Sequence, residues 1–189
     1  MSKKCRICLI GLGSNLQCES LNSVDIIASS IFSLNRNGVC VSKISKFYKS
    51  QAVPSGSGPD FINAAALIMT SLSPKKILRI LNKIELENCR ARSVRWGPRT
   101  LDLDLLAVGS IITPDKISFD HWMNLNSERQ GREAPDMLIL PHPRLHERAF
   151  VLGPLIDIAP DWFHPVLNKT VSEMFYELPK DVREQIWPL

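Results

Sequence analysis

The chain lacks the features that mark membrane, secreted and disulfide-stabilised proteins. No apolar run among its 189 residues approaches the roughly 18 that a membrane span needs. The first apolar run is short and is interrupted by Arg6 and Cys8, so it does not resemble a secretory signal. The five cysteines are odd in number, and they are scattered along a chain too large to need disulfide staples. We therefore expect a cytoplasmic protein with reduced cysteines.

Neither sign of charge dominates the sequence. Lysine and arginine total 23 and aspartate and glutamate 19, which gives a net charge of +4. So mild an excess is compatible with anionic small molecules and is weak evidence for nucleic acid. We find no internal repeat and no low-complexity tract. The expected partners are therefore small molecules, with neither nucleic acid nor membrane among them.

The order of the apolar patterns predicts an α+β protein with a ferredoxin-like βαββαβ core. Such a core has an antiparallel sheet with its helices on one face, which leaves the other face for a site. The patterns place strands at 4–12, 39–48, 61–70 and 102–108, and helices at about 21–34 and from 74 onward.

Local signals add detail to this core. Ser73 and Pro74 predict a helix start with a serine cap, and Gly13 is expected to end the first strand. The polar segment 109–136 shows no periodicity and is predicted as a long loop. Further C-terminal elements follow, because Thr170 and Glu173 form a capping box that opens a short helix.

Four arginines precede two carboxylates in the run from Arg90 to Leu105. In the alternation Leu-Asp-Leu-Asp-Leu, Asp102 and Asp104 leave the same face of a strand. Adjacent carboxylates repel one another unless a cation lies between them, and Mg²⁺ is typically held by one or two carboxylates, water and phosphates. A lone Asp-x-Asp is more often an ordinary solvated strand face, but the preceding arginines favour a site for a metal and a polyphosphate.

The chain resembles the 6-hydroxymethyl-7,8-dihydropterin pyrophosphokinases of folate biosynthesis. The matching motifs run in family order from residue 7 to about residue 160, and Arg-Trp-Gly-Pro-Arg-Thr-Leu-Asp-Leu-Asp is the most specific of them. They are Gly11–Leu16, Phe47–Tyr48, Asp60–Ala65, Ile84–Leu86, Arg95–Asp104 and Leu140–Leu152. The resemblance implies the ferredoxin-like fold and transfer of pyrophosphate from ATP to the pterin, with AMP as the second product. It also implies a catalytic domain over 1–165, a C-terminal helix and tail of the same domain over 166–189, and a chain that works beside, or fused to, dihydropteroate synthase.

The resemblance also implies the roles of individual residues. Asp102 and Asp104 would hold two Mg²⁺ ions, and Arg90, Arg92 and Arg99 would complete the catalytic set. The expected ATP contacts are Glu85, Arg92, Arg95, Trp96, Arg99, Leu105, His142 and Arg148, although Trp96 is equally well read as a loop anchor. The expected pterin contacts are Ser50, Val53, Phe61, Asn63 and Phe150, with the two phenylalanines stacking on the ring. Zinc at His142 and His146 is rejected, because a bare pair leaves zinc under-ligated.

Two other functions fit parts of the sequence. A nucleotidyltransferase also pairs a Gly-Ser with an Asp-x-Asp, but there the two motifs lie close together, whereas here Ser14 is far from Asp102. It would give an AMP-labelled product in place of free AMP. An RNA-binding module shares the strand order, but Phe61–Ala66 does not match its aromatic motif. Salt-sensitive RNA binding without ATP turnover would support that alternative.

Overall fold

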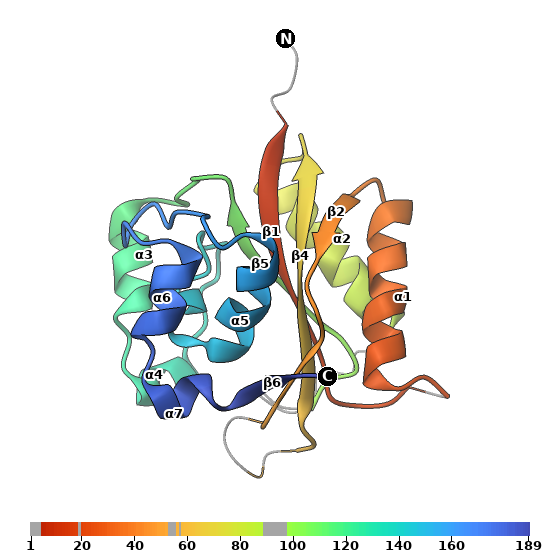
Figure 1. The fold of residues 1–189 in the computed structure, drawn as a ribbon. Coiled ribbons are helices and arrows are strands. Elements are labelled where there is room, and N and C mark those ends of the chain that lie inside the picture. Colours follow the sequence, from red (N-terminus) through yellow and green to blue (C-terminus); the bar gives the residue numbers. More distant parts are fainter. Residues whose placement is uncertain (1–4, 19, 53–55, 57, 89–97) are drawn as a thin grey trace.

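The protein is built on one antiparallel sheet, seen nearly edge-on in Figure 1. A computed structural model describes residues 5–18, 20–52, 56, 58–88 and 98–189. The strands are β1 (Arg6–Ser14), β2 (Cys40–Ile44), β3 (Tyr48–Ser50), β4 (Phe61–Thr70), β5 (Asp102–Val108) and β6 (Ile186–Pro188). Their order is β5-β1-β4-β3-β6, and β2 also pairs with β4. This arrangement confirms the predicted ferredoxin-like core.

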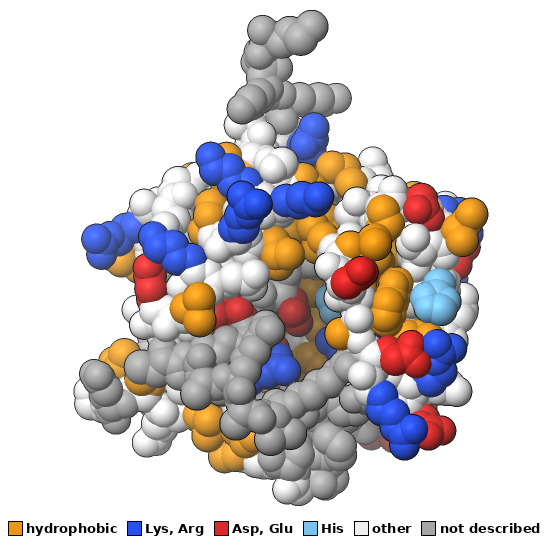
Figure 2. All heavy atoms as spheres, turned by 180° about the vertical axis from the view of Figure 1, so that it is seen from behind, with side chains coloured by type: hydrophobic (Ala, Val, Ile, Leu, Met, Phe, Trp, Pro, Cys, Tyr) orange, Lys and Arg blue, Asp and Glu red, His pale blue; other side chains and the backbone are white. Residues whose placement is uncertain are grey.

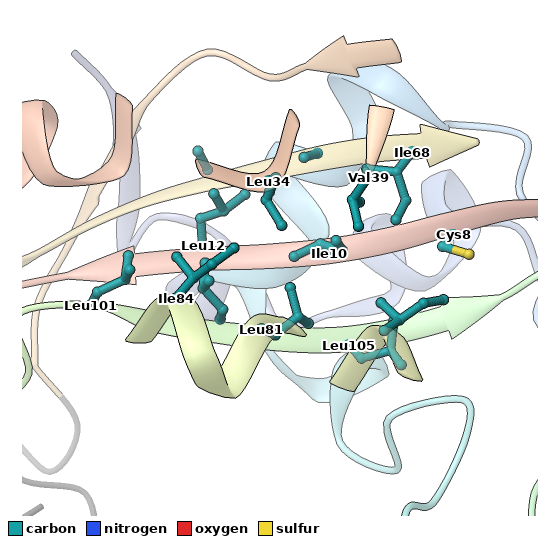
Figure 3. Packing of buried hydrophobic residues seen from close by; sticks show 14 of the residues in the cluster. Cys8, Ile10, Leu12, Leu34, Val39, Ile68, Leu81, Ile84, Leu101 and Leu105 are labelled. Carbon is teal, nitrogen blue, oxygen red and sulfur yellow. The ribbon is translucent and has the colours of Figure 1, made fainter. Parts of the chain in front are cut away.

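Helices α1 (Ser23–Arg36) and α2 (Pro74–Glu87) cover one face of the sheet. Alternate residues of the strands point toward them, as the period of two requires. Figure 3 shows Ile10 and Leu12 of β1 and Leu105 of β5 meeting Leu81 of α2 in this layer. Burial of these side chains therefore fixes which residues of each strand face the opposite side of the sheet.

The other face is covered by the C-terminal half of the chain. The remaining helices are α3 (Lys116–Met123), α4 (Ser127–Arg132), the 3₁₀ turn Leu145–Glu147, α5 (Ala149–Ile158), α6 (Val171–Glu177) and α7 (Lys180–Arg183). A second apolar cluster joins Leu9, Leu67 and Leu106 of the sheet to Leu152 and Leu155 of α5. In the described part of the chain, no helix is both long enough and apolar enough to span a bilayer.

Several local predictions need correction. Strand β1 continues through Gly13 to Ser14, because both residues pair with β4. The strand predicted at 39–48 is two strands, β2 and β3. Ser73 stands at the cap position of α2 without a side-chain hydrogen bond to the helix, whereas the capping box of Thr170 and Glu173 is confirmed.

The prediction of a structureless loop over 109–136 is wrong, because the segment contains α3 and α4. Asp115 caps α3 by accepting a hydrogen bond from the Ser118 backbone, and Asn126 caps α4 by accepting one from the Arg129 backbone. Only Phe119 of α3 is buried. Short helices with so little apolar surface give almost no periodic signal in the sequence.

His164, which precedes α6, is fully buried. Its Nδ1 accepts hydrogen bonds from the backbone N–H groups of Val166 and Leu167, at 3.2 and 3.1 Å. The rings of Phe119 and Trp162 lie 5.6 Å away, centre to centre. Burial, assisted by His146, lowers the pKa of His164 from 6.5 to about 4.

We expect His164 to reduce stability as the pH falls from 6.5 toward 4. The unfolded chain takes up a proton at this histidine in that range while the folded chain does not, so the free energy of unfolding drops by about 2–3 kcal/mol. In His164→Asn, the amide oxygen can accept the same backbone hydrogen bonds without titrating. Urea unfolding at pH 7 and pH 4.5 should show a smaller pH-dependent loss in the variant, and an equal loss would contradict this role.

Candidate active site

A cavity of about 640 Å³ opens on the sheet face that α5 only partly covers. Strands β1, β3, β4 and β5 form its floor, and the segment from Ile139 to Val151 forms one wall. Figure 2, which views the molecule from behind, shows a depression near its centre with acidic, basic and hydrophobic side chains in it. A mixed lining of this kind suits a ligand with a charged part and a flat apolar part.

Two glycines keep the floor of the cavity flat. Gly11 pairs with Asp104 of β5, and Gly13 pairs with Asp102. A Cβ atom added at Gly11 would lie 3.7 Å from the Asp104 Cβ, and one added at Gly13 would lie 3.7 Å from the Asn63 Oδ1. The glycines thus leave space between the carboxylates on β5 and the polar and aromatic side chains on β4. The Gly-Leu-Gly motif is in this way part of the site.

Asp102 and Asp104 both line the cavity, as the alternation in β5 predicts. The Arg99 guanidinium donates to Asp102, with 2.7 Å between Nη1 and Oδ1. Burial opposes the charge on Arg99, but Asp102 and, more weakly, Asp104 and Glu85 raise its pKa. A permanent cation thus stands beside two anionic oxygen donors, and the group can bind phosphate oxygens as well as a divalent cation.

Asn15 holds Arg99 in place and was not singled out by the sequence analysis. Its Oδ1 accepts from the Arg99 backbone N–H at 2.7 Å, and the Arg99 carbonyl accepts from the backbone of Asn15 and Leu16. Its Nδ2 donates to the Pro59 carbonyl at 2.9 Å, which ties down the approach to β4. The only sequence signal was the position of Asn15 inside the glycine motif.

The structure does not bring Glu85 and Leu105 to the described cavity lining. Glu85 is 3% exposed, and its Oε1 accepts a hydrogen bond of 2.7 Å from the Leu103 backbone N–H. Leu103 lies between the two aspartates, so Glu85 supports the strand that carries them. Leu105 packs in the apolar layer beneath α1 and α2, on the opposite face of the sheet from the aspartates.

His142 and Arg148 bring basic groups to the wall opposite the floor. Burial, together with repulsion from Arg148 and Arg144, lowers the pKa of His142 to about 3, so the ring is neutral at pH 7. Its Nδ1 accepts from the Arg144 backbone N–H at 3.2 Å, which leaves Nε2 as the hydrogen-bond donor. Burial also lowers the pKa of Arg148, while Asp104 opposes the shift.

The predicted pterin residues that the structure describes all line the cavity, and the part that they line is called its aromatic end below. Phe61 and Phe150 line it, from β4 and from α5. Asn63 is buried, and its Nδ2 donates to the Ser50 Oγ at 2.9 Å, which fixes which edge of the amide faces inward. The Arg148 guanidinium lies 5.7 Å from the centre of the Phe150 ring. This link joins the aromatic end of the cavity to its basic wall.

Some of the predicted residues lie outside the described part of the chain. They are Val53, Arg90, Arg92, Arg95 and Trp96.

The segment that contains α3 and α4 also contributes to the lining, which the sequence analysis missed. Trp122, Leu125, Glu133 and Pro135 reach the cavity, and Glu133 pairs with Arg129 at 2.6 Å. Their only signal in the sequence was the isolated apolar residue Trp122 in a polar stretch.

Comparison with known proteins agrees with this geometry. The family model of the 7,8-dihydro-6-hydroxymethylpterin-pyrophosphokinases matches residues 9–160. A Synechocystis 2-amino-4-hydroxy-6-hydroxymethyldihydropteridine pyrophosphokinase is 33% identical over 187 residues, which are 99% of this chain and 82% of the relative. The Haemophilus influenzae protein of the same name is 37% identical over 156 residues, which are 82% of this chain and 83% of that protein.

Some relatives and solved structures are much longer than this chain. An Arabidopsis thaliana mitochondrial folate synthesis bifunctional protein is 35% identical over 150 residues, and this chain covers 23% of it. A Plasmodium falciparum HPPK-DHPS crystal structure with pterin and p-hydroxybenzoate superposes with a TM-score of 0.66 at 14% identity, covering 98% of this chain and 47% of that one. That likeness shows a shared fold. The family model and the relatives of similar length show that the chain belongs to the 7,8-dihydro-6-hydroxymethylpterin-pyrophosphokinase family.

Proposed function

We propose that the chain transfers the terminal pyrophosphate of ATP to the hydroxymethyl oxygen of 6-hydroxymethyl-7,8-dihydropterin and releases AMP. The observation that carries the proposal is that one cavity contains the carboxylate pair, the basic wall and the aromatic end. Relatives that carry the name of this activity match most of the chain. The same site therefore offers groups for the polyphosphate and for a flat heterocycle.

The carboxylate pair fits Mg²⁺. Among the described residues, no group of three or more His, Cys, Asp or Glu side chains is arranged to hold a metal. Two carboxylates alone suit Mg²⁺, which fills its other positions with water and substrate phosphates. We propose that Asp102 and Asp104 hold two such ions. When bound, these would neutralise charge on the phosphates and align the reacting oxygen with the β-phosphorus.

The basic residues are assigned to the nucleotide. Arg99 and Arg148 offer planar cations that bind phosphate oxygens in pairs, and His142 offers a neutral N–H donor. Arg90, Arg92, Arg95 and Trp96 remain predicted contacts from the family resemblance. For Glu85 we propose an indirect role, through its hydrogen bond to the strand between the two aspartates.

The aromatic end is assigned to the pterin. Phe61 and Phe150 provide apolar surfaces for the faces of the ring, and the Asn63 amide can donate and accept at its polar edge. The hydrogen bond from Asn63 to Ser50 holds that amide in one orientation before the substrate arrives. Holding both substrates in a fixed orientation is most of what phosphoryl transfer requires of the protein.

The test is to mix the protein with ATP, Mg²⁺ and 6-hydroxymethyl-7,8-dihydropterin and to analyse the products. We expect AMP and the pterin diphosphate in equal amounts, dependent on both the metal and the pterin. Release of pyrophosphate with an AMP-labelled product would instead indicate nucleotidyl transfer. Absence of any pterin-dependent AMP would refute the proposed function.

Two wider assignments accompany this function. We propose that the protein works in the cytoplasm, because its five cysteines are odd in number and scattered along a chain too large to need disulfide staples. We also propose that it acts beside or fused to dihydropteroate synthase, because the solved neighbours include HPPK-DHPS chains of about twice its span. Detection of the protein in fractionated cells tests the first assignment.

A further inference from the structure

The C-terminal segment reaches the aromatic end of the cavity. Val182 of α7, Gln185 and Ile186 of β6 are among the lining residues. Strand β6 pairs antiparallel with β3, and the Leu189 backbone N–H donates to the Phe47 carbonyl at 3.0 Å. Figure 1 shows β6 leading from the helical side of the molecule to the sheet. The family match ends at residue 160, before this segment begins.

Ile186 lies beside the predicted pterin contacts in the sheet. Ser50 pairs with Phe61 of β4 on one side and with Ile186 of β6 on the other. Directly paired residues of neighbouring strands place their side chains on the same face. The Ile186 side chain is therefore the neighbour of Ser50, whose hydroxyl accepts the hydrogen bond from Asn63.

Ile186 also fits against helix α5 at a position that has no side chain. A Cβ atom added at Gly153 would lie 2.2 Å from the Ile186 Cδ1 and 3.7 Å from its Cγ1. Phe150 precedes Gly153 by three residues, so both lie on one side of α5. Ile186 thus fills the gap between the helix that carries Phe150 and the strand that carries Ser50.

We propose that Ile186 is a positioning residue for the pterin subsite. By occupying the space over Gly153, it sets the separation between Phe150 on α5 and Ser50 on β3, and so the fit of the ring between them. This inference rests on the proposed function and adds to it a cavity wall from outside the residues that the family model matches. It assigns no part of the phosphate chemistry to the C-terminal segment.

The test introduces a steric clash at Gly153 and then relieves that clash with a second substitution at Ile186. Gly153→Ala places a methyl group where the Ile186 Cδ1 lies, so the isoleucine must move. We expect the KM for the pterin to rise roughly tenfold, because the ring loses contact with the walls of its subsite. The KM for ATP and kcat should stay within about twofold. Gly153→Ala/Ile186→Val lacks the clashing Cδ1, and the next contact, at 3.7 Å, is an ordinary one. The double variant should recover the wild-type KM for the pterin.

Each outcome bears on one claim. If the unaltered protein forms no pterin-dependent AMP, the proposed function fails first. If it does, but Gly153→Ala leaves the KM for the pterin unchanged, raises both KM values equally, or is not rescued by Ile186→Val, the positioning role is wrong. Ile186→Val alone removes the Cδ1 without adding a clash, so it should raise the KM for the pterin less than Gly153→Ala does. Should Gly153→Ala not fold, Ile186→Ala must raise the KM for the pterin while sparing that for ATP, or the inference is overturned.

Discussion

Asp104→Asn should reduce turnover by about a thousandfold or more while leaving the fold intact, because loss of a metal ligand removes several kcal/mol of transition-state stabilisation. Asparagine has the shape of aspartate and keeps the packing beside Gly11, where the Asp104 side chain borders the cavity floor. What it removes is one negative oxygen donor. The rate of AMP formation measures the loss, and the melting temperature should stay close to that of the unaltered protein.

Asp104 is a cleaner target than Asp102. Asp102 is paired with Arg99 at 2.7 Å, so its replacement would also release a guanidinium. The matched control is Asp120→Asn on α3, since Asp120 pairs with the exposed Lys116 and such surface pairs contribute at most about 1 kcal/mol to stability. The control should keep turnover within about twofold. Undiminished pyrophosphate transfer by Asp104→Asn would exclude Asp104 as a metal ligand.

The central strands were predictable because a few strong patterns specify them. Leu103 and Leu105 alternate with Asp102 and Asp104, and burial of the leucines under the helices forces the carboxylates to the other face. The third predicted strand, over 61–70, coincides with β4, because its apolar run ends at turn residues on both sides. In such segments the local preference and the tertiary packing agree.

Other elements depend on contacts that no local pattern reveals. Strand β6 has three residues and exists through its pairing with β3, which is distant in sequence. Strand β1 passes through Gly13, which reads as a breaker but pairs with neighbours on both sides. Helix α4 has six residues and no buried side chain among those described. In these places tertiary contacts override weak local preference.

The residues of the site also divide into those that the sequence could predict and those that depend on contacts between distant segments. The carboxylates, the aromatic residues and Asn63 could be predicted from the family motifs, and the structure brings them to one cavity. The hydrogen bonds that hold them could not, because each joins segments far apart in the chain. Asn15 holds the Arg99 backbone, and Glu85 holds the backbone between the two aspartates. A side chain that positions another carries no chemical signature of its own in the sequence.

Phe61→Ala should weaken pterin binding roughly tenfold to a hundredfold, because stacking of a heterocycle on an aromatic side chain contributes about 1–3 kcal/mol. ATP binding should be unchanged. Phe61 lies on the cavity floor beside Gly13, at the aromatic end. Titration of the pterin and, separately, of ATP measures both dissociation constants without turnover. The control is Phe32→Ala, which removes a 65% exposed ring from α1 on the other side of the sheet and should alter neither.

Phe150→Ala should behave differently, and the difference tests the arrangement of the cavity. It removes the second stacking surface, so pterin binding should fall by a similar factor. It also removes the ring 5.7 Å from the Arg148 guanidinium, which is assigned to the nucleotide, so ATP binding should weaken by a few-fold as well. An equal loss of both ligands in Phe61→Ala would contradict a separate aromatic end. If Phe61→Ala weakened ATP binding and Phe150→Ala did not, the assignment of the two ends of the cavity to pterin and nucleotide would have to be reversed. The expected pattern follows only if Phe150, through Arg148, stands where the two subsites meet.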